Sequence, residues 1–234
     1  MDGDCFHSSS LTLFWRTMID EIQPPAEELS QLAFGVELLA AGASSRMGKP
    51  KMLLPWADTS VAGRLLAQWQ KLQPRQIAVV CAANDQAIHR ELDRLSFPEQ
   101  NRIINAEPER GMFSSIQCAA KWPGWLPLLT HWIIVLGDQP HLKTGSLRSL
   151  LAFARTEPLK ICQPSRNGRP RHPVMLPATA FLQLRDSSFS NLKAYLQIKI
   201  AETALREMDD LGLDFDLDEP ADYERAVRHF SGTD

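Results

Sequence analysis

The chain has 234 residues, 44% of them hydrophobic and 23% charged, a composition that supports one sizeable core and favours a single main domain. Its formal net charge is −3, so it has no general basic field for nucleic-acid phosphates or an anionic membrane surface. We therefore expect neither a nucleic-acid nor a membrane partner. Any anion site must be local, and a small-molecule partner is favoured.

The cysteines and the N-terminus indicate a cytoplasmic protein. The four cysteines lie singly along the chain with no C-x-x-C pair, at Cys5, Cys81, Cys118 and Cys162. This spacing argues against a zinc site and against a disulfide framework, and it fits reduced thiols. The first residues are acidic where a signal peptide would be basic, and no apolar stretch approaches the roughly 20 residues of a membrane helix.

Residues 1–35 are predicted to be a helical extension that precedes the main domain, residues 36–234. Apolar side chains recur there at helical spacing, namely Leu11, Phe14, Trp15, Met18, Ile19 and Ile22. We expect this face to pack on the chain's own core or on a second copy in a homodimer, and less so on a separate partner.

From Val36 onward, short apolar runs alternate with amphipathic segments of helix length. The predicted strands are VELLAA, QIAVVCAA, RIIN, HWIIVLG, KICQP and HPVML, and the predicted helices are VAGRLLAQWQKL, QAIHRELDRL, SSIQCAAKW and GSLRSLLAFAR. This alternation predicts an α/β domain with right-handed crossovers and a mostly parallel sheet between helices. A last helix is predicted to begin near Pro220.

The stretch VELLAAGASSRMGKPKMLLPW, which follows the first predicted strand, is a candidate phosphate loop. Small residues there leave backbone N–H groups free for an anion, and Arg46, Lys49 and Lys51 add positive charge. The Walker spacing fails, because Gly42 and Gly48 enclose five residues, and no G-x-G-x-x-G is present. The alternative is an ordinary strand-to-helix turn, which needs glycine but no cluster of cations.

Two acidic motifs could complement this loop. HWIIVLGDQP places Asp138 directly after a buried type of strand, at the same sheet edge as the loop. DFDLDEP offers Asp214, Asp216 and Asp218, which would project to one side of an extended segment. A turn cap for Asp138 and a solvated acidic loop are the alternatives. Mg²⁺ binds through carboxylates together with substrate phosphates, so the combination indicates magnesium-dependent nucleotidyl transfer.

Five motifs in order, LAAGASSRMGKPK, NAEPERGMFSSI, GDQP, GRPRHPVML and DLDEPADY, resemble the MobA-like NTP transferase family, which includes molybdenum cofactor cytidylyltransferase and its guanylyl counterpart. The resemblance runs from about Val36 to Phe230, and L-A-A-G resembles the cytidylyl branch. It implies a three-layer α/β/α, Rossmann-like sheet. It also implies Mg²⁺, CTP as the favoured nucleotide, molybdopterin as the phosphate-bearing acceptor and a client molybdoenzyme as a further partner.

The resemblance also implies a role for particular residues. The nucleotide would be bound by Ala41, Gly42, Ser44, Arg46, Gly48, Lys51 and Asn105, with Arg46, Lys51 and Asp138 as the catalytic residues. The metal would be held by Asp138, Asp216 and Asp218. The acceptor would lie near Gly111, Ser114, Ser115, Arg169 and His172. For His172 the alternative is that it braces its loop before Pro173.

The chain also departs from the family pattern in the part expected to bind the acceptor. LRDSSFSNLKAYL stands where a G-D-x-G-x-R element is expected, Arg171 stands where glycine is common, and Glu219 replaces the usual threonine. Two alternatives therefore stay open. One is a nucleotidyltransferase for a sugar phosphate or another small phosphate, and the other is a non-catalytic carrier that binds a nucleotide or a pterin.

Overall fold

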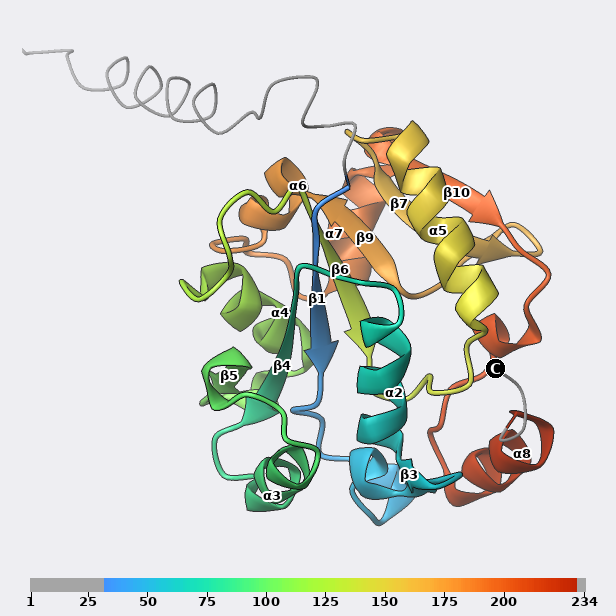
Figure 1. Ribbon diagram of the computed structural model, residues 1–234. Helices are drawn as coiled ribbons and strands as arrows, with labels where there is room; N and C mark the ends of the chain where they lie inside the picture. Colours follow the sequence, from blue (N-terminus) through green and yellow to red (C-terminus); the bar gives the residue numbers. More distant parts are fainter. Residues whose placement is uncertain (1–31, 231–234) are drawn as a thin grey trace, which may run out of the picture. The chain divides into compact units, whose positions relative to one another are not determined.

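The computed structural model describes residues 32–230, and these form an α/β domain around one central sheet (Figure 1). Within this part of the chain the sheet has eight strands in the order β10-β7-β9-β6-β1-β4-β5, and β8 pairs with β7. The strands of this sheet are β1 (Phe34–Leu39), β4 (Gln76–Ala82), β5 (Arg102–Asn105), β6 (His131–Leu136), β7 (Ile161–Arg166), β8 (Arg169–Pro170), β9 (Val174–Pro177) and β10 (Thr203–Glu207). A small hairpin joins β2 (Pro55–Trp56) to β3 (Thr59–Ser60).

Within residues 32–230, four of the seven pairings in the central sheet are parallel, in line with the predicted mostly parallel sheet. β1 pairs in parallel with both β4 and β6, and β4 with β5 and β10 with β7 are also parallel. β9 is the exception among the long strands, because it runs antiparallel between β6 and β7. The predicted helical part of residues 1–31 lies outside the described residues, and β1 begins at Phe34, two residues before the predicted start of the domain.

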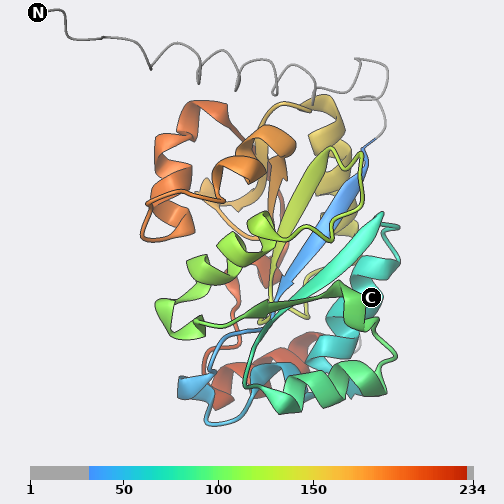
Figure 2. The ribbon, with the colours of Figure 1, turned by 90° about the vertical axis from the view of Figure 1, so that its left-hand side faces the viewer.

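Helices cover both faces of the sheet and make the three-layer arrangement (Figures 1 and 2). The helices are α2 (Val61–Gln70), α3 (Gln86–Arg94), α4 (Met112–Lys121), α5 (Thr144–Thr156), α6 (Ala178–Gln183), α7 (Leu192–Ile198) and α8 (Pro220–Phe230). Side chains of α2, α3, α5 and α8 join one apolar cluster, and those of α4, α6 and α7 join another on the opposite face. None of the described helices combines the length and apolarity that crossing a bilayer requires.

The predicted strands and the long helices are confirmed with small shifts in their ends, and the structure adds elements that the sequence pattern did not reveal. α6, α7 and β10 fill the interval between β9 and the C-terminal acidic motif. Leu205, in β10, is 42% exposed because the strand is an outer strand of the sheet. An exposed outer strand carries little apolar alternation, so the sequence gives it no strand signal.

Glu37 occupies the middle of β1, a strand with a neighbour on each side, and is 0% exposed. Because side chains alternate along a strand, Glu37 points to the same face of the sheet as Leu39, whereas Val36 and Leu38 point to the other face. Both of its carboxylate oxygens are buried without a hydrogen-bond partner. Burial raises the pKa of Glu37 well above its ordinary value, because the charged form would lose its hydration without compensation.

Replacing Glu37 with leucine should raise the free energy of unfolding by about 1–3 kcal/mol at neutral pH, because it removes an unpaired buried polar group. The gain should grow with pH. Above an ordinary glutamate pKa of about 4.3 and below the raised folded-state pKa, only the folded chain keeps the proton, so wild-type stability falls as pH rises. Urea unfolding of both proteins at about pH 5 and about pH 8 measures the difference.

Glu37→Gln is the matched control, since it removes the ionisable group but leaves a buried amide. It should lose the pH dependence and gain less stability than Glu37→Leu. A stabilisation by Glu37→Leu that is equal at the two pH values would contradict a protonated carboxyl in the folded state.

Candidate active site

The loop after β1 folds back on itself through Ser44. Ser44 has a positive φ of 49°, and its Oγ accepts a hydrogen bond from the backbone N–H of Lys51 at 3.1 Å. Two short 3₁₀ turns, η2 (Ser45–Met47) and η3 (Lys51–Leu53), are separated by Gly48, whose φ of 68° suits a residue without Cβ. The loop therefore brings Arg46 and Lys51 to the sheet edge where β1 and β6 end.

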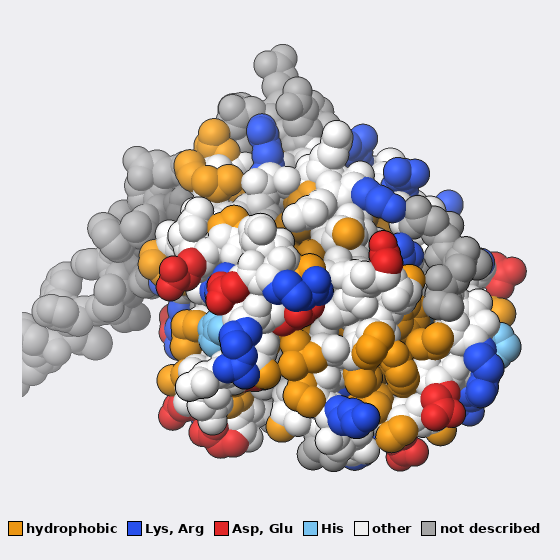
Figure 3. Space-filling model, turned by 60° about the horizontal axis from the view of Figure 1, so that its bottom comes forward, with side chains coloured by type: hydrophobic (Ala, Val, Ile, Leu, Met, Phe, Trp, Pro, Cys, Tyr) orange, Lys and Arg blue, Asp and Glu red, His pale blue; other side chains and the backbone are white. Residues whose placement is uncertain are grey.

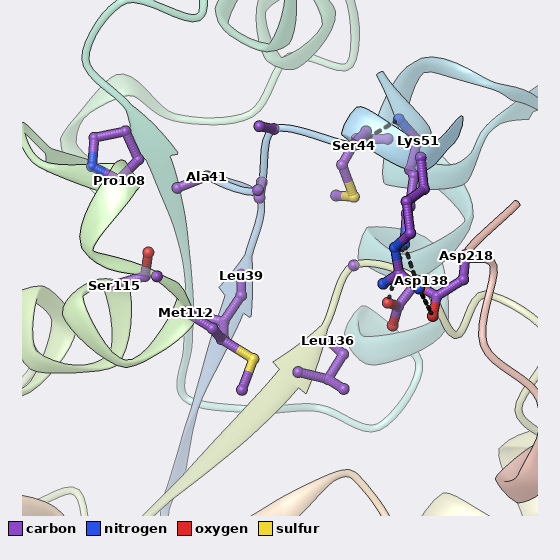
Figure 4. A pocket seen from close by; sticks show the side chains of 17 residues that line it. Leu39, Ala41, Ser44, Lys51, Pro108, Met112, Ser115, Leu136, Asp138 and Asp218 are labelled. Carbon is purple, nitrogen blue, oxygen red and sulfur yellow. Dashed lines mark hydrogen bonds and ion pairs between the residues drawn. The ribbon is translucent and has the colours of Figure 1, made fainter. Parts of the chain in front are cut away.

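Lys51 lies between two carboxylates from distant parts of the chain (Figure 4). Its Nζ is 3.4 Å from Asp138 Oδ2 and 3.0 Å from Asp218 Oδ1. The other oxygen of Asp218 is 3.0 Å from Arg46, whose side chain is 67% exposed. Two of the three predicted cations, Arg46 and Lys51, thus meet Asp138 and Asp218 in one cluster at the carboxyl ends of the strands.

The two carboxylates of this cluster have opposite pKa shifts. Burial raises the pKa of Asp138, and the neighbouring Asp216 and Asp218 add to the rise, while Lys51 opposes it. The hydrogen bond from Lys51 is the main cause that lowers the pKa of Asp218, with Arg46 contributing. One oxygen of Asp138, Oδ1, is buried and has no hydrogen-bond partner. Asp138 therefore has unused capacity for a cation.

The three aspartates of the C-terminal motif have three different environments. Asp216 accepts a hydrogen bond from Gln139 Nε2 at 2.9 Å, and the N–H of Leu217 donates to the backbone oxygen of Asp138 at 3.2 Å. Asp214 instead pairs with Arg166 and Arg171. The expectation that all three project to one side is wrong, because Asp214 ends a 3₁₀ turn, η7 (Leu211–Asp214), and is not in an extended segment.

The opposite wall of the site is built around the N-terminus of α4. Asn105 is buried at the end of β5, and its Nδ2 donates to Ser114 Oγ at 2.9 Å and to Ser115 Oγ at 3.0 Å. Gly111 precedes α4 with a φ of 90°. No side chain caps this helix. The N–H of Ser114 already donates to the backbone oxygen of Gly111, but the N–H groups of Met112 and Phe113 and the positive end of the helix dipole remain available to an anion.

A cavity of about 320 Å³ lies between these walls and brings together most of the predicted residues. Its lining includes Ala41, Gly42, Ser44, Arg46, Lys51, Gly111, Ser115, Asp138 and Asp218. Four further predicted residues do not line it, namely Gly48, Asn105, Ser114 and Asp216. Asn105 bonds to the lining residue Ser115, and Ser114 bonds to the lining residue Gly111. Asp216 bonds to Gln139, which follows Asp138. On the surface at this end of the molecule, basic and acidic side chains are interspersed rather than separated by sign (Figure 3).

Arg169 and His172 lie apart from the cavity. Arg169 is exposed in β8, the strand that pairs with the end of β7. His172 is half-buried, its Nδ1 has no hydrogen-bond partner, and burial lowers its pKa to about 4. The structure therefore leaves the acceptor role of these two residues as a prediction.

Sequence reasoning did not single out several residues that shape the cavity. Pro108 and Met112 line the wall opposite Lys51 (Figure 4). Gly137 is required by close packing, since a Cβ there would lie 2.6 Å from Met52 Sδ and 2.7 Å from the backbone oxygen of Leu39. The G-D-Q-P motif draws attention to Gly137 in the sequence. Its packing against Met52 and Leu39 could not be predicted, because these residues come from other segments of the chain.

Asp138 and Asp218 could supply some, but not all, of the oxygen ligands that a magnesium ion needs. Mg²⁺ takes oxygen ligands, and the unpartnered Oδ1 of Asp138 beside Asp218 is a donor of that kind. Within residues 32–230, no three His, Cys, Asp or Glu side chains converge into a complete metal-binding group. A metal here would therefore need further oxygen ligands, which a nucleotide's phosphates supply.

Residues 36–209 match the family described as MobA-like NTP transferase domain. The chain belongs to this family. The structure shows the mostly parallel sheet between helices that the resemblance to this family implies. The chain thus belongs to a family of NTP transferases.

Individual relatives support the same placement. The molybdenum cofactor cytidylyltransferase of Escherichia coli is 22% identical over 197 residues, which are 83% of this chain and 95% of that protein. The bifunctional protein GlmU of Prochlorococcus marinus is 31% identical over 129 residues, 53% of this chain, and the match spans only 26% of that protein. The manganese complex of Rv0371C from Mycobacterium tuberculosis shares the fold, with a TM-score of 0.62 at 21% identity, covering 85% of this chain and all of that one.

Replacing Lys51 with methionine should raise the pKa values of both Asp138 and Asp218, because the ammonium group that stabilises both charged carboxylates is removed. Carboxyl-carbon NMR over a pH titration measures both. Asp214 is the internal control, since Arg171 and Arg166 hold its pKa low and Lys51 does not. Unchanged pKa values at Asp138 and Asp218 would mean that Lys51 does not pair with them in solution.

Proposed function

We propose that this protein is an Mg²⁺-dependent nucleotidyltransferase that transfers CMP from CTP to a phosphate-bearing acceptor, molybdopterin being the favoured one, with release of pyrophosphate. One observation carries the proposal. Lys51 bridges Asp138 and Asp218 at the side of a cavity whose other walls are the loop after β1 and the uncapped end of α4. Cations, free N–H groups and carboxylates in one cavity are what a metal–triphosphate complex requires.

The loop residues would bind the triphosphate. Ala41, Gly42 and Ser44 line the cavity, so backbone N–H groups of this loop can approach phosphate oxygens. Lys51 and Arg46 would exchange their present carboxylate partners for those oxygens. Asn105 would contribute indirectly, through its hydrogen bond to Ser115, and Gly48 would shape the turn that carries both cations.

The reaction needs no protein nucleophile. An oxygen of the acceptor phosphate would attack the α-phosphorus of CTP in line, one P–O bond would form, and the bond to pyrophosphate would break. Because negative charge spreads over the transferred group, the protein's contribution is positioning together with the charges of Arg46 and Lys51. A bound magnesium ion would neutralise phosphate charge during this step, and Asp138, Asp216 and Asp218 are the side chains that would hold it.

The choice of CTP and of a pterin acceptor rests on the L-A-A-G loop sequence and on the likeness to the E. coli cytidylyltransferase over most of both chains. Gly111, Ser114 and Ser115 at the start of α4 would lie near the acceptor or the base. Arg169 and His172 would bind the acceptor only if it reaches beyond the cavity, which suits a ligand larger than a simple phosphate.

A thermal-shift panel with Mg²⁺ and each of CTP, GTP, ATP and UTP tests the nucleotide. A ligand at about one hundred times its Kd stabilises the fold by about 2.7 kcal/mol, and we expect this effect with CTP. Pyrophosphate release with molybdopterin, and with a sugar phosphate as the rival acceptor, then tests catalysis. Binding without pyrophosphate from any acceptor would favour the non-catalytic carrier, and no response to any nucleotide would contradict the proposal.

Asp138→Ala should lower the rate of pyrophosphate release by about two orders of magnitude or more, because it removes a carboxylate that neutralises the metal and orders the phosphates. Asp214→Ala is the matched control, since Asp214 belongs to the same acidic motif but pairs with Arg166 and Arg171 outside the cavity. We expect this control to stay close to the wild-type rate. Near-normal turnover in Asp138→Ala would show that Asp138 is not a ligand of the catalytic metal.

A further inference from the structure

His141 is a buried histidine that lies between the two acidic motifs, and none of the roles above involves it. It follows Asp138 by three residues, is 3% exposed, and directs Nε2 at two backbone oxygens, of Gly212 at 3.1 Å and of Phe215 at 2.9 Å. Carbonyl oxygens can only accept, so Nε2 carries the hydrogen and donates to both. Phe215 directly precedes Asp216, the first aspartate of the predicted metal pair on this segment, and Gly212 lies in η7, the 3₁₀ turn that ends just before Phe215.

The ring of His141 also packs against the segments that carry the other charged groups of the site. Its centroid lies 5.1 Å from that of Phe230, at the end of α8, and 5.7 Å from that of Phe215. Trp56, on the hairpin that follows η3 and Lys51, is 6.3 Å away. One imidazole therefore contacts the Asp138 loop, the segment before Asp216, the C-terminal helix and the hairpin next to Lys51.

Other bonds fix this acidic segment at its two ends. Between those ends, Asp214 pairs with Arg166 and Arg171 through its side chain, and His141 holds the backbone. At the first end, the buried Asp210 accepts from Ser146 Oγ at 2.6 Å and from the N–H of Lys143 at 3.2 Å. At the second end, the N–H of Leu217 donates to the backbone oxygen of Asp138. The bonds to Gly212 and Phe215 lie between these two points.

We infer that His141 is a positioning residue whose Nε2–H holds the backbone of residues 212–215 so that Asp216 and Asp218 lie near Asp138, where the three carboxylates can share a cation whose remaining ligands come from the nucleotide's phosphates. This inference rests on the proposed function, because the arrangement of the three carboxylates matters only if they hold a metal with a nucleotide. His141 touches neither the cavity nor the predicted ligands with its own polar atoms. It acts through the backbone that carries them.

Three variants separate the hydrogen bond from the packing. His141→Phe keeps a ring among the aromatic neighbours and removes the N–H donor. His141→Gln restores an N–H near the position of Nε2 and removes the ring. His131→Phe is the matched control, because His131 is 2% exposed and its Nε2 lies 3.0 Å from the backbone oxygen of Pro158, but it begins β6 at the end of the strand away from Asp138.

The readout is Mn²⁺ binding in the presence of CTP and without acceptor, followed by electron paramagnetic resonance, so that turnover plays no part. We expect His141→Phe to weaken Mn²⁺ binding about tenfold or more, as loss of groups that orient metal ligands commonly does. His141→Gln should recover most of it, and His131→Phe should bind as the wild type does. Amide exchange at Leu217 should become faster in His141→Phe and remain unchanged in His131→Phe.

Two negative results have different meanings. If the wild type binds Mn²⁺ with CTP and His141→Phe binds it equally well, the inference is overturned while the proposed function stands. If the wild type binds Mn²⁺ with none of the four nucleoside triphosphates, the proposed function fails and the inference fails with it. Equal losses in His141→Phe and His131→Phe would indicate general destabilisation and would also overturn the positioning role.

Discussion

The ionic contact of Lys51 with Asp138 and Asp218 is the interaction on which the site depends. Carboxylates that converge at a partly buried position lose hydration and repel each other, so their approach is unfavourable unless a cation lies between them. Lys51 supplies that cation, and Arg46 adds a second, more exposed one on the outer oxygen of Asp218. The arrangement keeps the acidic end of the cavity assembled in a form in which one cation can be exchanged for another.

The scaffold makes this contact possible by bringing three loops to one sheet edge. β1 and β6 are adjacent and parallel, so the loop that carries Lys51 and the loop that carries Asp138 leave the sheet side by side. The absence of a side chain at Gly137 lets these loops approach, with Met52 and the backbone of Leu39 filling the space. The acidic segment is added from the far end of the chain and is attached to the Asp138 loop by the bonds of Gln139, His141 and Leu217.

Sequence reasoning recovered the parts of this arrangement that depend on local pattern. Buried strands such as β4 and β6 are nearly continuous apolar runs and can be recognised from the sequence. Asp138 follows the end of β6 and the phosphate loop follows the end of β1, so the topology of a parallel sheet predicts that the two lie close together. The alternating spacing could not separate Asp214 from Asp216 and Asp218, although the family resemblance left Asp214 out of the metal set. The separation depends on a 3₁₀ turn and on arginines 43 and 48 residues away. Sequence reasoning likewise missed His141, whose hydrogen-bond partners lie more than seventy residues along the chain.

Glu37 gives the folding reaction a feature that lies outside the active site. Because its carboxyl is fully buried without partners, the pKa of Glu37 is higher in the folded chain, which therefore keeps this proton to a higher pH than the unfolded chain does. Folding is then coupled to proton uptake from the solvent. The enthalpy measured for folding by calorimetry accordingly includes the ionisation enthalpy of whatever buffer donates that proton, and it differs between buffers that hold the same pH.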